Sequence, residues 1–108
     1  MITATFRHYG DGKIRGFELR GHSGLAEAGA DILCAAVSAM AMLVINTSTG
    51  IFGAAAETKQ DETIPLLIFA LAAPAENEAV YGVLTGFYDQ LRALSEDHPK
   101  NLRVKSDI

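Results

Sequence analysis

One apolar run constrains this sequence more than any other feature. From Ile32 to Ile45 every side chain is apolar except that of Ser38. A membrane-spanning helix needs about 20 such residues, so we interpret the run as a core helix and expect no membrane span. Asp31 directly precedes the run and is a good N-cap, so a helix should extend to about residue 50. A helix that is apolar on nearly all sides must be buried on most of them, within the domain or against a second subunit.

The residues before this run predict a β-hairpin. Residues 2–9 alternate, with Ile2 and Phe6 on one face, and a period of two is typical of a half-buried strand. The Gly-Asp-Gly sequence of residues 10–12 is a turn signal, and residues 13–20 form a second predicted strand.

The second half of the chain predicts another strand pair. Residues 54–60 and 64–72 are the expected strands, and Asp61-Glu62 is the expected turn between them. Pro65 falls near the start of the second strand, where its missing N–H is tolerated.

A second helix should follow Pro74, because apolar residues recur at i, i+3, i+4 and i+7 until His98-Pro99 ends the pattern. These apolar positions are Val80, Val83, Leu84, Phe87, Leu91 and Leu94. A short last strand is predicted from Leu102 and Val104. The order ββαββα(β) indicates an α+β fold, in which two main helices cover a mixed or antiparallel sheet of about four to five strands. We expect one domain, residues 1–108.

Charge and cysteine usage limit the partners and the compartment. The net charge of -4 argues against direct nucleic-acid contact, since nucleic-acid binders usually carry a basic face. Arg103 and Lys105 alternate with apolar neighbours and should form the solvated face of a strand. The single cysteine excludes an internal disulfide and fits a reducing compartment. We also expect no signal peptide.

Cys34 is the residue most open to two interpretations. A lone cysteine in an apolar helix is more often a small core residue. However, Cys34 falls in the first turn of the expected helix, where the helix dipole stabilises a thiolate. His22 lies at the other end of a glycine-containing loop that we expect to be mobile, with glycines at Gly21, Gly24 and Gly29. A thiol and an imidazole suffice for acyl transfer through sulfur, but sequence separation does not show that they meet.

Two further polar residues have a structural and a catalytic interpretation. Asp31 either caps the helix or orients His22, and a carboxylate beside Cys34 opposes a thiolate unless it pairs with the imidazolium. Ser38 lies one turn after Cys34 on the same helix face. We favour a Ser38 hydroxyl bonded back to its own helix over one that lines a site.

Metal and phosphate chemistry find no support in the sequence. Zinc requires three or four closely spaced ligands, and His8, His22 and His98 show no such spacing with Cys34. The glycine loop lacks the Lys-Ser/Thr of a P-loop. We therefore expect no metal and no cofactor.

The segments Gly21-His22-Ser23 and Gly29 to Ser38 resemble the ribosomal-processing cysteine protease family, Prp. That family carries a G-H-x loop followed by G-x-D-I-(V/L)-C-A-A/G-x-S at a helix start. By this resemblance Cys34 is the nucleophile and His22 the general base, while Asp31 and Ser38 have supporting roles.

The resemblance also implies a biological setting. Family members are bacterial and cytoplasmic, are expected to form homodimers and use no cofactor. Members with a known role remove the N-terminal extension of large-subunit ribosomal protein twenty-seven, cutting after an aromatic residue. Two alternatives stay open: a non-catalytic ribosome-assembly or dimerisation module with a buried structural Cys34, or a thiol hydrolase that acts on another amide.

Overall fold

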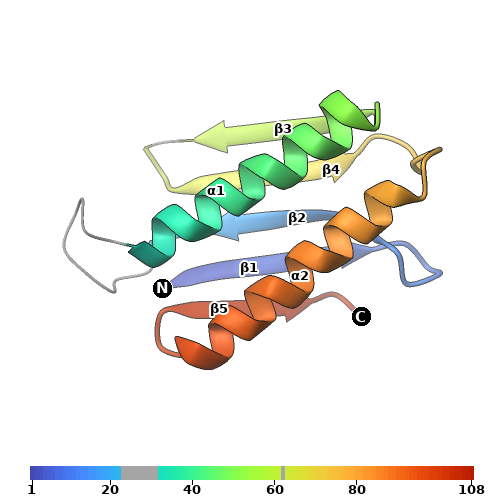
Figure 1. The fold of residues 1–108 in the computed structure, drawn as a ribbon. Helices are drawn as coiled ribbons and strands as arrows, with labels where there is room; N and C mark the ends of the chain where they lie inside the picture. The colour runs from blue at the N-terminus through green and yellow to red at the C-terminus, as the bar shows by residue number, and fades with distance from the viewer. Residues whose placement is uncertain (23–31, 62) are drawn as a thin grey trace.

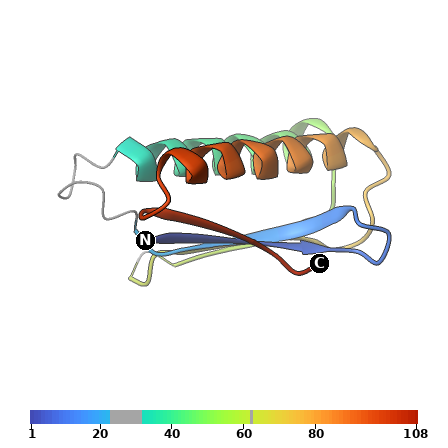
Figure 2. The same cartoon turned by 90° about the horizontal axis from the view of Figure 1, so that it is seen from below.

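The computed structural model describes residues 1–22, 32–61 and 63–108. Across these residues the chain forms a five-stranded sheet with both α-helices on one face, and the other face of the sheet is open (Figures 1 and 2). The elements in chain order are β1 (Ile2–His8), β2 (Ile14–Arg20), α1 (Ile32–Asn46), the π-helical turn η1 (Thr47–Ile51), β3 (Ala56–Asp61), β4 (Leu66–Leu71), α2 (Ala79–Asp97) and β5 (Leu102–Ser106).

The sheet order is β3-β4-β2-β1-β5, and the pairs are antiparallel except for the parallel β1–β5 pair. This confirms the predicted α+β class and the order ββαββαβ with a mixed sheet. Each helix is the crossover between two strands that run in the same direction, because parallel strands cannot be joined by a tight turn. Helix α1 leads from β2 to β3, and α2 leads from β4 to β5.

The predicted alternation of β1 is confirmed by its burial. Ile2, Ala4 and Phe6 are buried under the helices, whereas Thr3 and Thr5 face the open side of the sheet. Aromatic rings join the two layers: Phe17 of β2 lies 4.9 Å from Phe87 of α2, centroid to centroid, in an edge-on contact. Such contacts add to the burial of apolar area that stabilises the fold.

Helix α2 follows its predicted pattern and has one additional buried residue. Val80, Leu84, Phe87 and Leu91 are buried, and Val83 and Leu94 pack half-buried beside them. Tyr81 is also buried, which the pattern did not predict, and its hydroxyl accepts a 2.9 Å hydrogen bond from the backbone N–H of Ala75. The helix ends at His98, as predicted.

The apolar run was judged too short to span a membrane. That argument is wrong for the helix as a whole, because the helical backbone continues through the polar residues after Asn46. The segment Ile32–Ile51 has 20 residues and is apolar enough to cross a membrane by length and composition alone. Packing favours the core-helix interpretation, since Leu33, Val37 and Ala41 are buried in the core. The expectation of burial on most sides is not met within one chain, because the outer face of α1 is exposed.

The connection between β3 and β4 differs slightly from the prediction. Asp61 is the last residue of β3 rather than part of the turn, and Glu62 lies outside the described residues. The Asp61 carboxylate accepts hydrogen bonds from the backbone N–H of Thr63 at 2.9 Å and of Ile64 at 3.3 Å. Pro65 directly precedes β4, as expected.

Candidate active site

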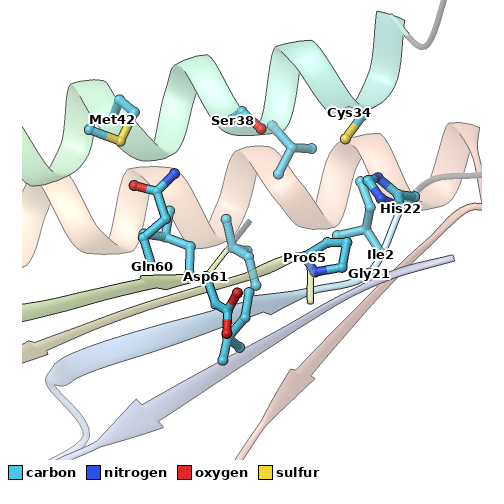
Figure 3. Close-up of a pocket in the computed structure, with 13 residues that line it drawn as sticks. Ile2, Gly21, His22, Cys34, Ser38, Met42, Gln60, Asp61 and Pro65 are labelled. Atoms are coloured by element: carbon cyan, nitrogen blue, oxygen red, sulfur yellow. The ribbon is translucent and has the colours of Figure 1, made fainter. Parts of the chain in front are cut away.

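A pocket of about 270 Å³ lies between the N-terminal half of α1 and the sheet (Figure 3). Its walls come from four parts of the chain: the start of β1, the end of β2, α1, and the connection between β3 and β4. The lining residues are Ile2, Leu19, Gly21, His22, Cys34, Val37, Ser38, Met42, Gln60, Asp61, Pro65, Leu66 and Leu67.

The backbone at Gly21 determines where His22 enters this pocket. Gly21 has φ +92°, a conformation that favours glycine, and its N–H donates a 2.9 Å hydrogen bond to the carbonyl of Pro65. A Cβ at this position would lie 2.4 Å from the carbonyl oxygen of Met1. Only glycine therefore fits, and the exposed His22 follows a backbone that is hydrogen-bonded to the residue directly before β4.

Cys34 reaches the same pocket from α1. It lies in the first turn of the helix, as expected, and is partly buried against the core. Its sulfur points from the helix toward the sheet, at the same end of the pocket as the His22 ring (Figure 3). The structure therefore brings together the thiol and the imidazole, whose proximity could not be inferred from their spacing in the sequence.

The remaining predicted site residues divide into two groups. Ser38 lines the pocket one helical turn after Cys34. Within the described residues its hydroxyl makes no back-bond to α1, whereas Thr49 donates one to the carbonyl of Ile45 at 2.8 Å. Asp31, Gly24 and Gly29 lie outside the described residues, so the expected N-cap and glycine loop stay predictions.

Sequence reasoning missed the wall opposite Cys34. Gln60 and Asp61 at the end of β3, together with Pro65, border the pocket because β3 pairs with β4 on the part of the sheet that α1 covers. The Gln60 side chain points toward α1, whereas the Asp61 carboxylate points away from it (Figure 3). Hydrogen bonds from Thr63 and then from Ile64 hold the pKa of Asp61 below its usual range, so Asp61 is negatively charged at neutral pH. Among the lining residues that the sequence analysis did not name, Met42 could have been expected, because it follows Ser38 by one helical turn on the same face of α1.

Metal-ligand geometry is absent from the part of the chain that the structure describes, where no group of three His, Cys, Asp or Glu residues could hold an ion. His8 instead contacts Asp107, with Nδ1 at 2.7 Å from a carboxylate oxygen, and His98 ends α2. The pocket thus offers a nucleophile and a proton acceptor, which suits acyl transfer without further groups.

Known proteins match this chain in sequence and in fold. The family model for the cysteine protease Prp matches residues 1–103. The ribosomal processing cysteine protease Prp of Bacillus subtilis is 30% identical over 111 residues, which cover 100% of this chain and 99% of that protein.

Two solved structures match over nearly the whole chain. The essential ribosomal processing protease Prp from S. aureus, in complex with a covalently linked product peptide, has a TM-score of 0.91 at 22% identity, covering 99% of this chain and 100% of that one. SMU.848 from Streptococcus mutans has a TM-score of 0.84 at 28% identity, covering 98% and 93%. Fold, pocket and relatives define a cysteine-type endopeptidase. The chain belongs to the Prp family of cysteine proteases.

Proposed function

We propose that this endopeptidase removes the N-terminal extension of large-subunit ribosomal protein twenty-seven, with Cys34 as nucleophile and His22 as general base. The observation that carries the proposal is that both residues line one pocket. Because the chain contains a single cysteine, a thiol peptidase of this sequence has no other sulfur nucleophile.

The proposed reaction follows from the pair. His22 takes the proton of the Cys34 thiol, and the thiolate attacks the scissile carbonyl carbon. The resulting oxyanion accepts hydrogen bonds from backbone N–H groups at the start of α1. Collapse breaks the C–N bond while the imidazolium protonates the leaving amine, and water then hydrolyses the thioester with His22 again as base.

The pocket chemistry supports an extended peptide as substrate. Ile2, Leu19 and Val37 give it an apolar floor that suits an aromatic side chain before the scissile bond. The net charge of -4 attracts a basic ribosomal extension. In the names of the relatives, "ribosomal processing" describes the same class of substrate.

Further residues complete the proposed site. Ser38 presents a hydroxyl one turn from Cys34, and Asp31 caps α1 or orients His22. We propose that the loop after the fixed Gly21, which contains Gly24 and Gly29, opens for the peptide and closes over it. Since the named relatives are bacterial, we place the reaction in the bacterial cytoplasm.

We also propose that the protein works as a homodimer, with the outer face of α1 as the interface. Four residues at helical spacing form an exposed apolar stripe on this face: Ile32, Ala35, Ala39 and Leu43. Ile32 is 78% and Leu43 66% exposed, and the two alanines between them would let a second helix approach closely. Light scattering should show a dimer for the wild type and a monomer for Leu43→Glu, while Thr85→Glu on exposed α2 should stay dimeric.

The proposal is tested with a synthetic peptide that carries the ribosomal extension. Mass spectrometry should show one cut after an aromatic residue by the wild type and none by Cys34→Ala. Binding of the peptide without any cut, together with a thiol that resists alkylation, would favour the non-catalytic assembly module. Turnover of a small amide with no preference for the peptide would favour another thiol hydrolase.

A further inference from the structure

The open face of the sheet carries most of the positive charge of this acidic chain. Six of the nine lysines and arginines project from it, and all six are exposed: Arg7, Arg15, Arg20, Lys59, Arg103 and Lys105. Three acidic residues share the face, namely Glu18, Glu57 and Asp61. The face therefore has a net charge of +3, and the remaining three cations and ten acids of the sequence give -7.

Strand register concentrates these cations on one half of the sheet. In one row across the strands Arg103 lies beside Thr3, which lies beside Arg20. In the next row Lys105 lies beside Thr5. We call the surface formed by Arg7, Arg15, Arg20, Arg103 and Lys105 over β5, β1 and β2 the basic sheet patch. Glu57 and Asp61 lie on β3, at the opposite edge of the sheet.

The cations of the patch are mostly available to a ligand. Arg20 contacts Glu18 at 3.1 Å. Within the described ranges the other four cations of the patch make no ion pair. Thr3 and Thr5 lie between them and add hydroxyl groups that can bond to phosphate oxygens.

A shallow hollow of about 140 Å³ lies at one end of the patch, where Arg7, Arg15 and Glu18 line it together with residues 68–70 of β4. Gly16 also lines it, and a Cβ at that position would lie 2.3 Å from the carbonyl oxygen of Phe69, so no larger residue fits there. Two guanidinium groups beside a small hollow suit a phosphate group, since arginine binds phosphate oxygens through paired N–H donors.

We propose that the basic sheet patch binds the phosphate backbone of RNA. The choice of RNA rests on the proposed function, since a protease that processes a ribosomal protein meets its substrate beside ribosomal RNA. The patch has no aromatic stacking platform among the described residues on this face, so we expect binding through the backbone with little sequence preference.

A membrane surface fits this patch less well. Interfacial binding needs apolar side chains beside the basic ones. None of the large apolar side chains that are exposed in the described part of the chain belongs to β1, β2 or β5: Met1, Ile32, Met42, Leu43, Ile51, Ile64 and Ile108.

The expectation of no nucleic-acid contact rested on the net charge of -4. That value is the sum of a positively charged open face and a negatively charged remainder, which the fold places on different sides of the molecule. The acidic helix α2 packs behind the sheet (Figure 2). The helix layer lies on the side of the sheet opposite the patch, and interactions between exposed charges decay over a Debye length of about 8 Å at physiological salt. The acids of α2 are therefore largely screened from a ligand on the patch. The pocket lies on the helix side of the sheet, so peptide and RNA can be bound together.

The test measures anisotropy of a short, fluorescein-labelled single-stranded RNA with two matched triple variants. Arg7→Glu/Arg103→Glu/Lys105→Glu changes the patch, and Lys13→Glu/Arg92→Glu/Lys100→Glu makes the same charge change away from it. We expect the patch variant to bind at least tenfold more weakly than the wild type, and the control variant to lose at most twofold. Affinity of the wild type should fall steeply with salt, with a log–log slope of about -3 for roughly four to five phosphates.

Several outcomes would overturn the proposal. These are no binding by the wild type, equal losses in both triple variants, or binding to phosphatidylserine vesicles in place of RNA. If the reversed charges prevent folding, the neutral Arg7→Gln/Lys105→Gln variant replaces the first triple variant, with an expected loss of at least threefold. The folded patch variant should cleave the free extension peptide as fast as the wild type. If neither protein cleaves the peptide, the proposed function is wrong, whereas unchanged RNA binding by the patch variant contradicts the RNA proposal alone.

Discussion

The backbone N–H of Gly21 and the carbonyl of Pro65 are joined by a 2.9 Å hydrogen bond that ties the end of β2 to the start of β4. This bond fixes the chain directly before His22, in a conformation with φ +92°. The position of the proposed base thus depends on a backbone contact between two strands rather than on the imidazole's own partners.

The substitution Gly21→Ala should damage both stability and activity. The positive φ alone costs about 1–2 kcal/mol for an L-residue, and the new Cβ would meet the carbonyl oxygen of Met1. Displacing His22 by an ångström should lower kcat/KM by about 100-fold.

Gly12→Ala is the matched control for Gly21→Ala. Gly12 has the same φ of +92°, but an added Cβ meets nothing within 4 Å. Gly12→Ala should lower the free energy of unfolding only by the cost of the positive φ, and it should cleave the extension peptide at the wild-type rate. Equal kcat/KM values for the two variants would contradict the positioning role of Gly21.

Tyr81→Phe should destabilise the fold without affecting cleavage. It removes the hydroxyl that accepts the Ala75 N–H and leaves that donor unpaired, at a cost of about 1–2 kcal/mol in the free energy of unfolding. Urea unfolding measures this cost. Tyr88→Phe, which retains the ring contact with Phe6, is the control and should be near neutral. A neutral Tyr81→Phe would show that the hydrogen bond contributes nothing to stability.

The contact between His8 and Asp107 should make stability depend on pH in the acid range. The hydrogen bond from His8 holds the pKa of Asp107 below its ordinary value of 3.8. A carboxyl whose pKa is lower in the folded state stabilises the fold above its unfolded pKa, and this stabilisation is lost as the pH falls through the lower, folded-state pKa.

The measurement is the difference in unfolding free energy between the wild type and Asp107→Asn. We expect this difference to be larger near pH 5 than near pH 2.5, because the carboxylate is neutralised at the lower pH. Asp89→Asn, on the exposed face of α2, should show no such trend. A difference that grows toward low pH would contradict the assigned direction.

Local patterns predicted most of the elements but not how they meet. The alternation in β1 and the helical spacing in α2 are local signals, and both were confirmed by burial. The parallel pairing of β5 with β1 joins the two ends of the chain, and no local pattern encodes it. The predicted extent of the first helix, to about residue 50, is confirmed, because α1 continues into the π-helical turn Thr47–Ile51.

The same distinction explains the site. Cys34 and His22 carry a sequence motif and could be proposed from it. Gln60 and Asp61 belong to no sequence motif. They line the pocket because β3 pairs with β4 on the part of the sheet that α1 covers. The basic sheet patch was missed for a similar reason, since its cations come from three strands and only their register places them side by side.

The most direct test of the central claim compares cleavage of the extension peptide by the wild type, Cys34→Ala and His22→Ala. If the pair acts as proposed, the wild type cuts the peptide once, Cys34→Ala does not cut it, and His22→Ala loses at least about 1,000-fold in kcat/KM. Circular dichroism should show that both variants stay folded. Cleavage that persists in folded Cys34→Ala would contradict the assignment of the nucleophile and with it the proposed mechanism.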